Sequence, residues 1–291
     1  MSTAHGGPDA TGSLALAVPV LAVVAGYLLA ASRERAGGRG WSRWRTASFA
    51  AGAAAALAAL TGPVARTGDF TGHVLQHLLV GMLAPLGLAL GAPVTLLLRA
   101  AGTGPARRLV RLLHGRPVRL LAHPVPVLAA NLGGLYLLYL TPAYRLAQAY
   151  PSVHALVHAH LFVGGYLFAW LIAGPDPGPR RLPVPVRLVL LGVAVAGHAT
   201  LAQLMYAGLL LGPAVPADEV RAGAVLMYYG GDLAEILLAL ALLAMWRPGP
   251  RRRRHLAPAA ADRRRPLVPA AAGRPGGRTD GGAPAAPGTG V

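Results

Sequence analysis

One stretch of this chain, from Asp69 to Leu98, restricts the possible folds more than any other. It reads DFTGHVLQHLLVGMLAPLGLALGAPVTLLL and is apolar for long enough to cross a bilayer. About 20 apolar residues at a rise of about 1.5 Å each span a hydrocarbon core of about 30 Å. Yet His73 and His77 lie near its start, on the same face of the expected helix. Imidazoles at that spacing can share a metal ion or line a polar pocket.

The composition agrees with an integral membrane protein. Of the 291 residues, 54% are hydrophobic and only 13% are charged. A soluble domain carries about 25% charged residues. The chain has no cysteine, which excludes disulfides, thiolate metal sites and thiol redox chemistry. A metal would therefore be held by histidine, methionine, carboxylate or backbone oxygen.

Seven apolar runs predict an all-α membrane protein, a seven-transmembrane-helix bundle over residues 14–246. The expected spans are 14–31, 46–63, 73–98, 120–140, 153–173, 186–211 and 223–246. All 27 basic residues are arginines, and they gather in the first, third and fifth connections and in the tail after Met245. The other connections hold one each, namely Arg66, Arg145 and Arg221. By the positive-inside rule, this alternation puts the N-terminus outside and the C-terminus in the cytoplasm.

The two ends of the chain differ from its apolar middle. Residues 1–13 are polar and lack arginine, so we expect an extracytoplasmic tail and a retained first helix rather than a cleaved signal peptide. Residues 247–291 are rich in Arg, Pro, Ala and Gly, which predicts a disordered cytoplasmic tail whose RRRR run can touch anionic lipid head groups. The net charge of +17 follows this topology, so we do not expect nucleic-acid binding.

In this topology the polar side chains within the apolar runs gather in the outer half of the membrane. His154 and His158 repeat the spacing of His73 and His77 at the outer start of the fifth span. The candidate metal ligands are His73, His77, His154, His158, His198, Met205 and Met227. The candidates for ion or proton coupling, or for supporting the ligands, are Asp69, Asp232 and Glu235.

The acidic pair Asp232 and Glu235 is costly to place in a membrane. An acidic side chain near mid-bilayer costs about 2.5–3.5 kcal/mol, so it normally faces the bundle interior and has a partner. Two such residues on one face of a helix indicate ion or proton handling, in a deeper site or gate with His198. The alternative is that they only hydrogen-bond His198 and fix the helix packing.

The ligand types leave several metals open. Imidazole with thioether suits copper, especially Cu(I), whereas imidazole with carboxylate suits Zn(II) or Cu(II). Paired histidines on two helices can also ligate a haem from both sides. Spacing alone does not separate these cases.

Four motifs occur in order along the chain: HVLQHLLVGMLAPLGLALGAPVTLLLRA, HALVHAHLFVGGYLFAWLIAGPDPGPRR, GHATLAQLMYAG and GAVLMYYGGDLAEILLALALLAMW. Together they resemble the CtaG family of cytochrome c oxidase assembly factors over about residues 14–246. Tyr228 and Tyr229 stand where that family more often has tryptophan. The resemblance implies a multi-pass bacterial plasma-membrane protein that is needed to form active haem–copper oxidase and handles copper for its buried copper centre. The positions that match the family's motifs are His73, His77, His154, His158, His198, Met227 and Asp232.

We therefore expect a copper-binding assembly factor that passes the ion to a haem–copper oxidase subunit within the membrane. The four outer histidines would bind first, with Met205 and Met227 as soft auxiliary ligands. The rival interpretations are a haem-binding electron carrier using the same histidines, a copper transporter or resistance protein, and an assembly scaffold. No pairing of a nucleophile with a base stands out, so we do not expect an enzyme.

Overall fold

The computed structural model describes residues 10–61, 64, 68–178, 182–211 and 215–246, and these are almost wholly helical. The long helices are α1 (Ala10–Ala36), α2 (Arg43–Thr61), α8 (Pro124–Leu140), α10 (Pro151–Ala173), α11 (Val184–Tyr206) and α12 (Ala217–Ala244). The shorter ones are α3 (Phe70–Leu78), α4 (Ala84–Leu90), α5 (Pro93–Ala100), α6 (Thr103–Leu113), α7 (Arg116–Leu121) and α9 (Ala143–Ala149). The predicted tail over 247–291 lies outside the described residues, and α1 begins four residues before its predicted start.

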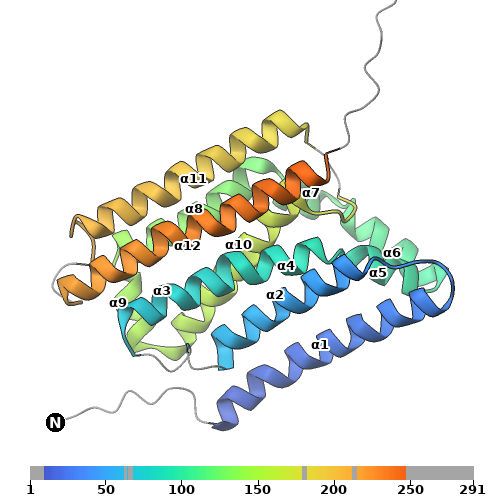
Figure 1. The fold of residues 1–291 in the computed structure, drawn as a ribbon, viewed down its shortest axis with the longest axis horizontal. Coiled ribbons are helices and arrows are strands. Elements are labelled where there is room, and N and C mark those ends of the chain that lie inside the picture. Colours follow the sequence, from blue (N-terminus) through green and yellow to red (C-terminus); the bar gives the residue numbers. More distant parts are fainter. Residues whose placement is uncertain (1–9, 62–63, 65–67, 179–181, 212–214, 247–291) are drawn as a thin grey trace, which may run out of the picture. The chain divides into compact units, whose positions relative to one another are not determined.

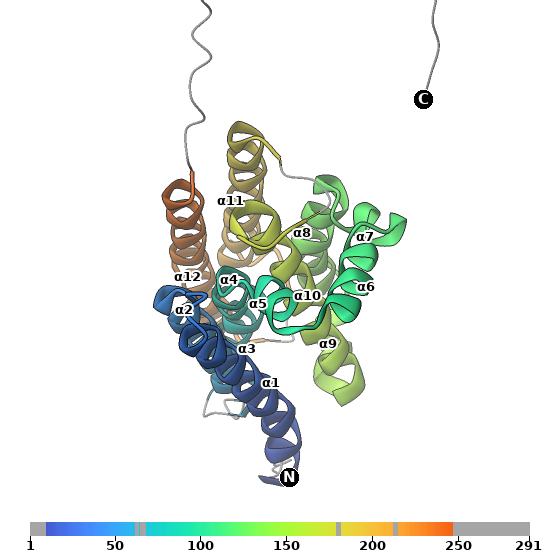
Figure 2. The same ribbon diagram turned by 90° about the vertical axis from the view of Figure 1, so that its right-hand side faces the viewer.

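The long helices run side by side as a bundle (Figure 1). Seen end-on in Figure 2, α4 and α10 lie in the middle, with α2, α12, α11 and α8 around them and α1 outermost. Two clusters of buried apolar side chains fill the space between these helices, one around Phe70, Leu201 and Met227 and the other around Phe168, Ile172 and Leu238.

Within the described residues, five helical stretches are long and apolar enough to cross a membrane. They are Ala17–Ala36, Phe70–Leu90, Pro151–Ala173, Val184–Tyr206 and Ala217–Ala244. Helices α8 and α9 qualify only as one span with a bend of 80° between them. The alanine-rich α2 covers residues 46–61 of the predicted span 46–63 but is less apolar than these stretches. The chain is therefore a multi-pass helical membrane protein, while the count of seven spans and the orientation stay predictions.

The predicted single span over 73–98 is wrong at its C-terminal end. Helix α3 continues through a π-helical segment (Leu79–Leu83) into α4, which ends at Leu90. Ala92 adopts a left-handed conformation, with φ of 53°, and Pro93 follows it. Because proline has no N–H to continue a helix but suits the first position of a new one, the chain turns here and α5 begins.

The new start of α5 is held by an acidic side chain from far along the sequence. The buried carboxylate of Asp176, between α10 and α11, accepts hydrogen bonds from the backbone N–H of Val94 at 3.0 Å and of Thr95 at 2.7 Å. The Thr95 hydroxyl also donates to it at 2.6 Å. These bonds satisfy backbone donors that no turn of α5 can satisfy, so the α10–α11 connection is tied to the break after α4.

Glycines bring the central helices together at backbone distance. A Cβ atom on Gly165 of α10 would overlap the carbonyl of Gly81, within the π-helical segment. A Cβ on Gly52 of α2 would lie 2.6 Å from the backbone nitrogen of Leu88 and 2.9 Å from the carbonyl carbon of Gly87. Small residues allow such close approach in membrane bundles, where packing rather than hydrophobicity joins the helices.

Several connections contain helices that the sequence did not predict. Helices α6 and α7 fill the arginine-rich connection before α8, and α9 follows α8. Helix α8 begins at Pro124 rather than at residue 120, because His123 caps it and proline occupies its first position. Helix α11 ends at Tyr206, before Gly208, whose φ is 73°, and not at residue 211.

The two ends of the bundle differ in chemistry. The starts of α3 and α10, which carry the paired histidines, lie together at the end where α9 lies (Figure 1). The ends of α1, α4 and α12 lie at the opposite end, beside α5, α6 and α7. The arginines of the first and third connections gather there: Arg33, Arg35, Arg39, Arg43, Arg45, Arg99, Arg107, Arg108, Arg111, Arg116 and Arg119.

Candidate metal centre

Four histidines from α3 and α10 meet inside the bundle. Ring centroids lie 4.0 Å apart for His73 and His77 and 4.2 Å apart for His154 and His158. Across the two helices, the centroid distances are 5.9 Å for His73–His154 and 5.2 Å for His77–His158. One ring nitrogen from each of His73, His77 and His154 lies within 4.8 Å of the others. The two predicted pairs therefore form one cluster, which we call the histidine cluster.

Local sequence explains why the cluster lies at the start of its helices. Asp69 caps α3 by accepting a hydrogen bond from the backbone N–H of Gly72 at 3.3 Å. The backbone N–H of Phe70 donates to the Glu219 carboxylate of α12 at 3.1 Å. Pro151 occupies the first turn of α10. Asp69, a predicted coupling residue, thus has a structural role as the cap that sets where the first histidine pair begins.

The donor atoms of the histidine cluster fit a metal ion. His73, His77 and His158 are buried and His154 is half-buried. The Nε2 atom of each of the four has no hydrogen-bond partner within the described residues. Two nitrogens bound to one ion at about 2.0–2.1 Å are about 3.4 Å apart in a tetrahedral site, so small side-chain rotations bring three onto one ion. Unpaired buried nitrogens are costly, and a bound cation would satisfy them.

A tyrosine that the sequence analysis missed orients one of these rings. The Nδ1 atom of His77 lies 3.2 Å from the hydroxyl oxygen of Tyr139, which is buried on α8. When Nδ1 carries the proton it donates to this oxygen, and the lone pair of Nε2 is left for a metal. The ring of Tyr144 on α9 also lies 5.0 Å from that of His73. The sequence does contain a signal for Tyr139: it is a tyrosine within the largely aliphatic run LGGLYLLYL, and a buried tyrosine hydroxyl usually has a hydrogen-bond partner.

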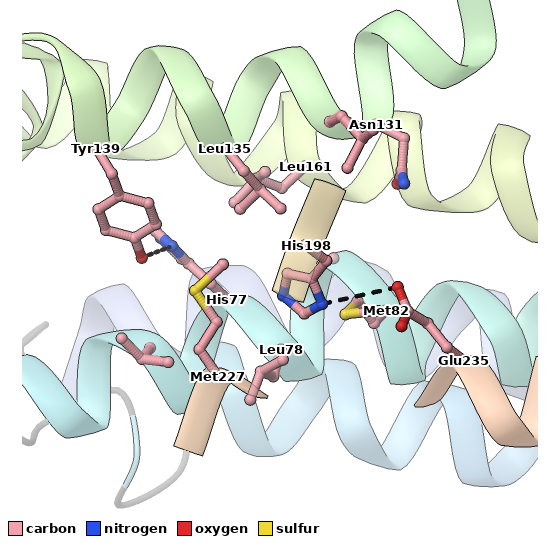
Figure 3. A pocket seen from close by; sticks show the side chains of 13 residues that line it. His77, Leu78, Met82, Asn131, Leu135, Tyr139, Leu161, His198, Met227 and Glu235 are labelled. Carbon is pink, nitrogen blue, oxygen red and sulfur yellow. Dashed lines mark hydrogen bonds and ion pairs between the residues drawn. The ribbon is translucent and has the colours of Figure 1, made fainter. Parts of the chain in front are cut away.

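The deeper residues form a second group next to the cluster. His198 of α11 lies with its Nδ1 3.7 Å from Oε1 of Glu235 on α12, and both side chains are buried. The two residues line one cavity together with His77 and Met227 (Figure 3). Asp232 is only half-buried and does not line it. Glu235 therefore lies beside His198, and the predicted coupling role of the acidic pair stays a prediction.

One predicted methionine lies elsewhere. Met205 is fully buried in the apolar core around Phe70 and Leu201 and does not line the cavity. Met82, which the sequence analysis did not select, lines the cavity from the π-helical segment. Depth in the membrane was predictable for both residues, but the direction in which each side chain points was not.

Fold and site together define a class of protein: a multi-pass helical membrane protein with a buried, metal-compatible histidine cluster between two of its helices. Comparison with known sequences gives the family. The chain belongs to the cytochrome c oxidase caa3 assembly factor family, Caa3_CtaG, whose sequence model matches residues 25–248. This confirms the resemblance drawn from the motifs. The family's description names an assembly role and no catalysed reaction.

The curated relatives are mycobacterial. The uncharacterized protein ML1998 of Mycobacterium leprae is 31% identical over 264 residues, which cover 81% of this chain and 40% of the relative. The uncharacterized protein Mb0105 of Mycobacterium bovis is 32% identical over 255 residues, covering 80% of this chain and 38% of the relative. The chain thus spans about two fifths of the length of the curated relatives it matches. No solved structure matches it.

Proposed function

We propose that this protein binds copper, preferably as Cu(I), and supplies it to a haem–copper oxidase while that enzyme is assembled in the bacterial plasma membrane. The observation that carries the proposal is the convergence of His73, His77 and His154, whose ring nitrogens lie within 4.8 Å of one another. Copper is the cargo in this scheme. Imidazole nitrogens bind it well, and the thioether of Met227 in the adjoining cavity favours the reduced, softer ion.

The family supports the proposed recipient. An assembly factor for cytochrome c oxidase acts on an enzyme whose copper centre lies within a membrane subunit, so a donor site inside a helical bundle is suited to it. The histidine cluster lies between α3 and α10, inside the helical bundle. The proposed role is therefore binding and release, with no chemical step on the copper ion.

The haem-carrier alternative agrees less well with the packing. A haem held between paired histidines takes two axial ligands, one on each face of the macrocycle. Here four imidazole rings lie with centroids between 4.0 and 5.9 Å apart along the cluster. The second pair of rings occupies the space that a macrocycle between the first pair would need. A small ion agrees better with this arrangement.

The test is metal and pigment analysis of the detergent-purified protein, followed by substitutions. His77→Ala with His158→Ala should remove bound copper and lower oxidase activity in the membrane, without lowering the amount of this protein. His160→Ala is the matched control, because His160 lies on α10 but is exposed and lies against the carbonyl of Ala130 at 3.1 Å. Unchanged copper content and oxidase activity in the double variant would contradict the proposal. A haem absorption band in the wild type would favour the electron carrier.

A further inference from the structure

A second polar site adjoins the histidine cluster on its inner side. The cavity that begins at His77 has a volume of about 30 Å³. Its walls are mainly aliphatic, but five side chains with imidazole, thioether or carboxylate groups reach it: His77, Met82, His198, Met227 and Glu235. A space of this size holds about two water-sized occupants, so it suits a bare ion and not an organic cofactor. Figure 3 shows these side chains pointing toward one another across it.

The π-helical segment explains how Met82 joins His77 in this cavity. In an α-helix a residue five positions further on lies about 140° around the axis, on another face. The segment Leu79–Leu83 has π-type hydrogen bonds, which add a residue to the turn. The added residue brings Met82 back onto the face of His77. A thioether and an imidazole from the same continuous helical stretch therefore line one cavity.

The deeper wall of the cavity carries an unsatisfied acidic group. Glu235 is 5% exposed and His198 is 4% exposed. The Oε2 atom of Glu235 has no hydrogen-bond partner within the described residues. The His198 ring lies directly against Gly231, in the space that a side chain at that position would fill. A cation in the cavity would neutralise the buried Glu235 carboxylate and could be bound by His198, Met82 and Met227, which line the same cavity.

We propose that this cavity is a second, soft cation subsite, formed by the thioethers of Met82 and Met227 and the imidazole of His198, with Glu235 balancing the charge. The subsite rests on the proposed function, since His77 belongs both to it and to the histidine cluster. An ion that leaves the cluster through His77 meets sulfur ligands next, which prefer Cu(I) and Ag(I) to Zn(II). The path from the cluster thus selects the reduced ion.

The test uses Ag(I), a redox-inert substitute for Cu(I), on the purified full-length protein. Wild type should bind two silver ions per chain, with a sulfur shell in X-ray absorption. Met82→Leu with Met227→Leu preserves volume and should leave one ion with a nitrogen-only shell. Met245→Leu, at the exposed end of α12, is the matched control and should keep both ions.

Two results separate failure of the subsite from failure of the proposed function. Two ions and an unchanged sulfur shell in the Met82 and Met227 double variant would overturn the subsite alone. The variant His73→Ala with His154→Ala should lose the nitrogen-bound ion and keep the sulfur shell. If that variant keeps both ions, the histidine cluster is not the copper site and the proposed function fails.

An independent feature, the connection between α5 and α8, points to a lipid partner. Helix α6 separates its residues cleanly: Arg107, Arg108 and Arg111 lie within about 100° of arc, and the leucines, valine and alanine lie on the other side. None of its residues is buried, and Leu112 is 68% exposed. The next helix, α7, repeats the pattern with Arg119 beside exposed Leu120.

The position of α6 and α7 matches the membrane surface. They follow the end of the Phe70–Leu90 span and precede α8, and Figures 1 and 2 show them at the flank of the bundle near that end. The chain from Arg99 to His123 contains six arginines and no acidic residue. A short helix with a cationic face and an exposed apolar face lies in the interface of a bilayer, with arginine on the head groups. From this, we infer that the segment formed by α6 and α7 binds anionic phospholipid.

The absence of cysteine makes this inference testable with single spin labels. The full-length protein carrying Leu112→Cys is labelled and placed in vesicles of phosphatidylcholine with phosphatidylglycerol. The label should be reached by oxygen and shielded from a water-soluble nickel relaxant. Gly104→Cys, on the cationic side of α6 with open space around it, is the control and should be reached by nickel.

Charge dependence completes the test. In the Leu112→Cys background, changing Arg107, Arg108 and Arg111 to Gln should expose the label to nickel. Vesicles of phosphatidylcholine alone should have the same effect. A label at Leu112 that nickel reaches in anionic vesicles would overturn the inference. A label that stays shielded from nickel in neutral vesicles and in the arginine variants would also overturn it, and would favour an apolar contact with a partner protein.

Discussion

Replacing Gly165 by alanine tests whether the contact between α10 and the π-helical segment sets the geometry of the histidine cluster. The new Cβ would lie 2.9 Å from the carbonyl carbon of Gly81, and closer still to its oxygen, where ordinary contacts begin at 3.4 Å. Because the obstructing atoms are backbone and the oxygen is the nearer of the two, α10 must move away from the π-helical segment by about 1 Å or more. A functional constellation needs its side chains placed within about 0.5 Å. The substitution therefore disturbs the cluster without touching any of its histidines.

The energetic balance follows from two opposing terms. Overpacking costs about 1–3 kcal/mol, whereas alanine in place of a helical glycine gains about 1 kcal/mol. We expect Gly165→Ala to lower the free energy of unfolding by up to about 2 kcal/mol. We expect it to weaken copper binding about 10–100-fold, the range typical when residues that support metal ligands are changed. Denaturant unfolding in detergent and competition with a Cu(I) chelator measure the two effects.

The neighbouring residue provides the control. A Cβ on Gly164 would lie 3.4 Å from the carbonyl oxygen of Ala130, an ordinary contact. Gly164→Ala should therefore gain up to about 1 kcal/mol of stability and bind copper as wild type does. If Gly165→Ala binds copper as tightly as Gly164→Ala, the backbone contact does not set the geometry of the site, and the reasoning fails.

Three further substitutions test other contacts. Tyr139→Phe removes the hydroxyl beside His77 and should weaken copper binding about 10–100-fold in chelator competition, with the amount of folded protein unchanged. Asp176→Ala removes the bonds that start α5 and should lower the free energy of unfolding by about 1–3 kcal/mol in denaturant; an unchanged midpoint would show that the cap is dispensable. Gly52→Ala forces α2 away from the backbone of Gly87 and should cost about 1–3 kcal/mol by the same assay.

Much of the architecture was predictable because bilayer thickness limits what an apolar run can be. The run at 153–173 became α10, which starts only two residues earlier because Pro151 suits the first turn of a helix. The run at 223–246 became α12, whose start was predicted six residues too late, because the polar first turn with Asp218 and Glu219 is also helical. The two histidine pairs were also predictable as pairs, because a spacing of four residues fixes a common face in any α-helix. The topology prediction placed both pairs in the outer half of the membrane. That they meet depends on the packing of α10 against the π-helical segment and α4, which the spacing did not predict.

The features that sequence did not predict depend on contacts between distant residues. Asp176 starts a helix 81 positions earlier, at Thr95, and no local pattern joins the two. The π-helical segment has no sequence signature of its own; its Gly81 lies against Gly165 of another helix. Met82 joins the inner cavity only because of that segment. Met205 and Met227 differ in rotation about their helix axes, which packing rather than sequence decides.

The number of membrane crossings depends on α2, and its contacts make a prediction. Near one end, the Gln76 side chain of α3 donates to the carbonyl of Ala59 at 2.8 Å. Toward the other end, the Ser48 hydroxyl donates to the carbonyl of Gly87 at 3.1 Å. Helix α2 therefore lies antiparallel to Phe70–Leu90 along most of its length, and if that stretch crosses the bilayer, α2 must cross with it.

Alanine explains why α2 crosses without being strongly apolar: its small side chains serve contact with α1 and α4 rather than with lipid. Single cysteines at Ser42 and Gly68, which are exposed on either side of α2, should be labelled by an impermeant thiol reagent from opposite sides of the membrane. Labelling of both from the same side would mean that α2 does not cross. The seven-helix topology would then be wrong. With α2 outside the count, the two ends of the chain lie on opposite sides of the membrane only if α8 and α9 do not cross it as one span.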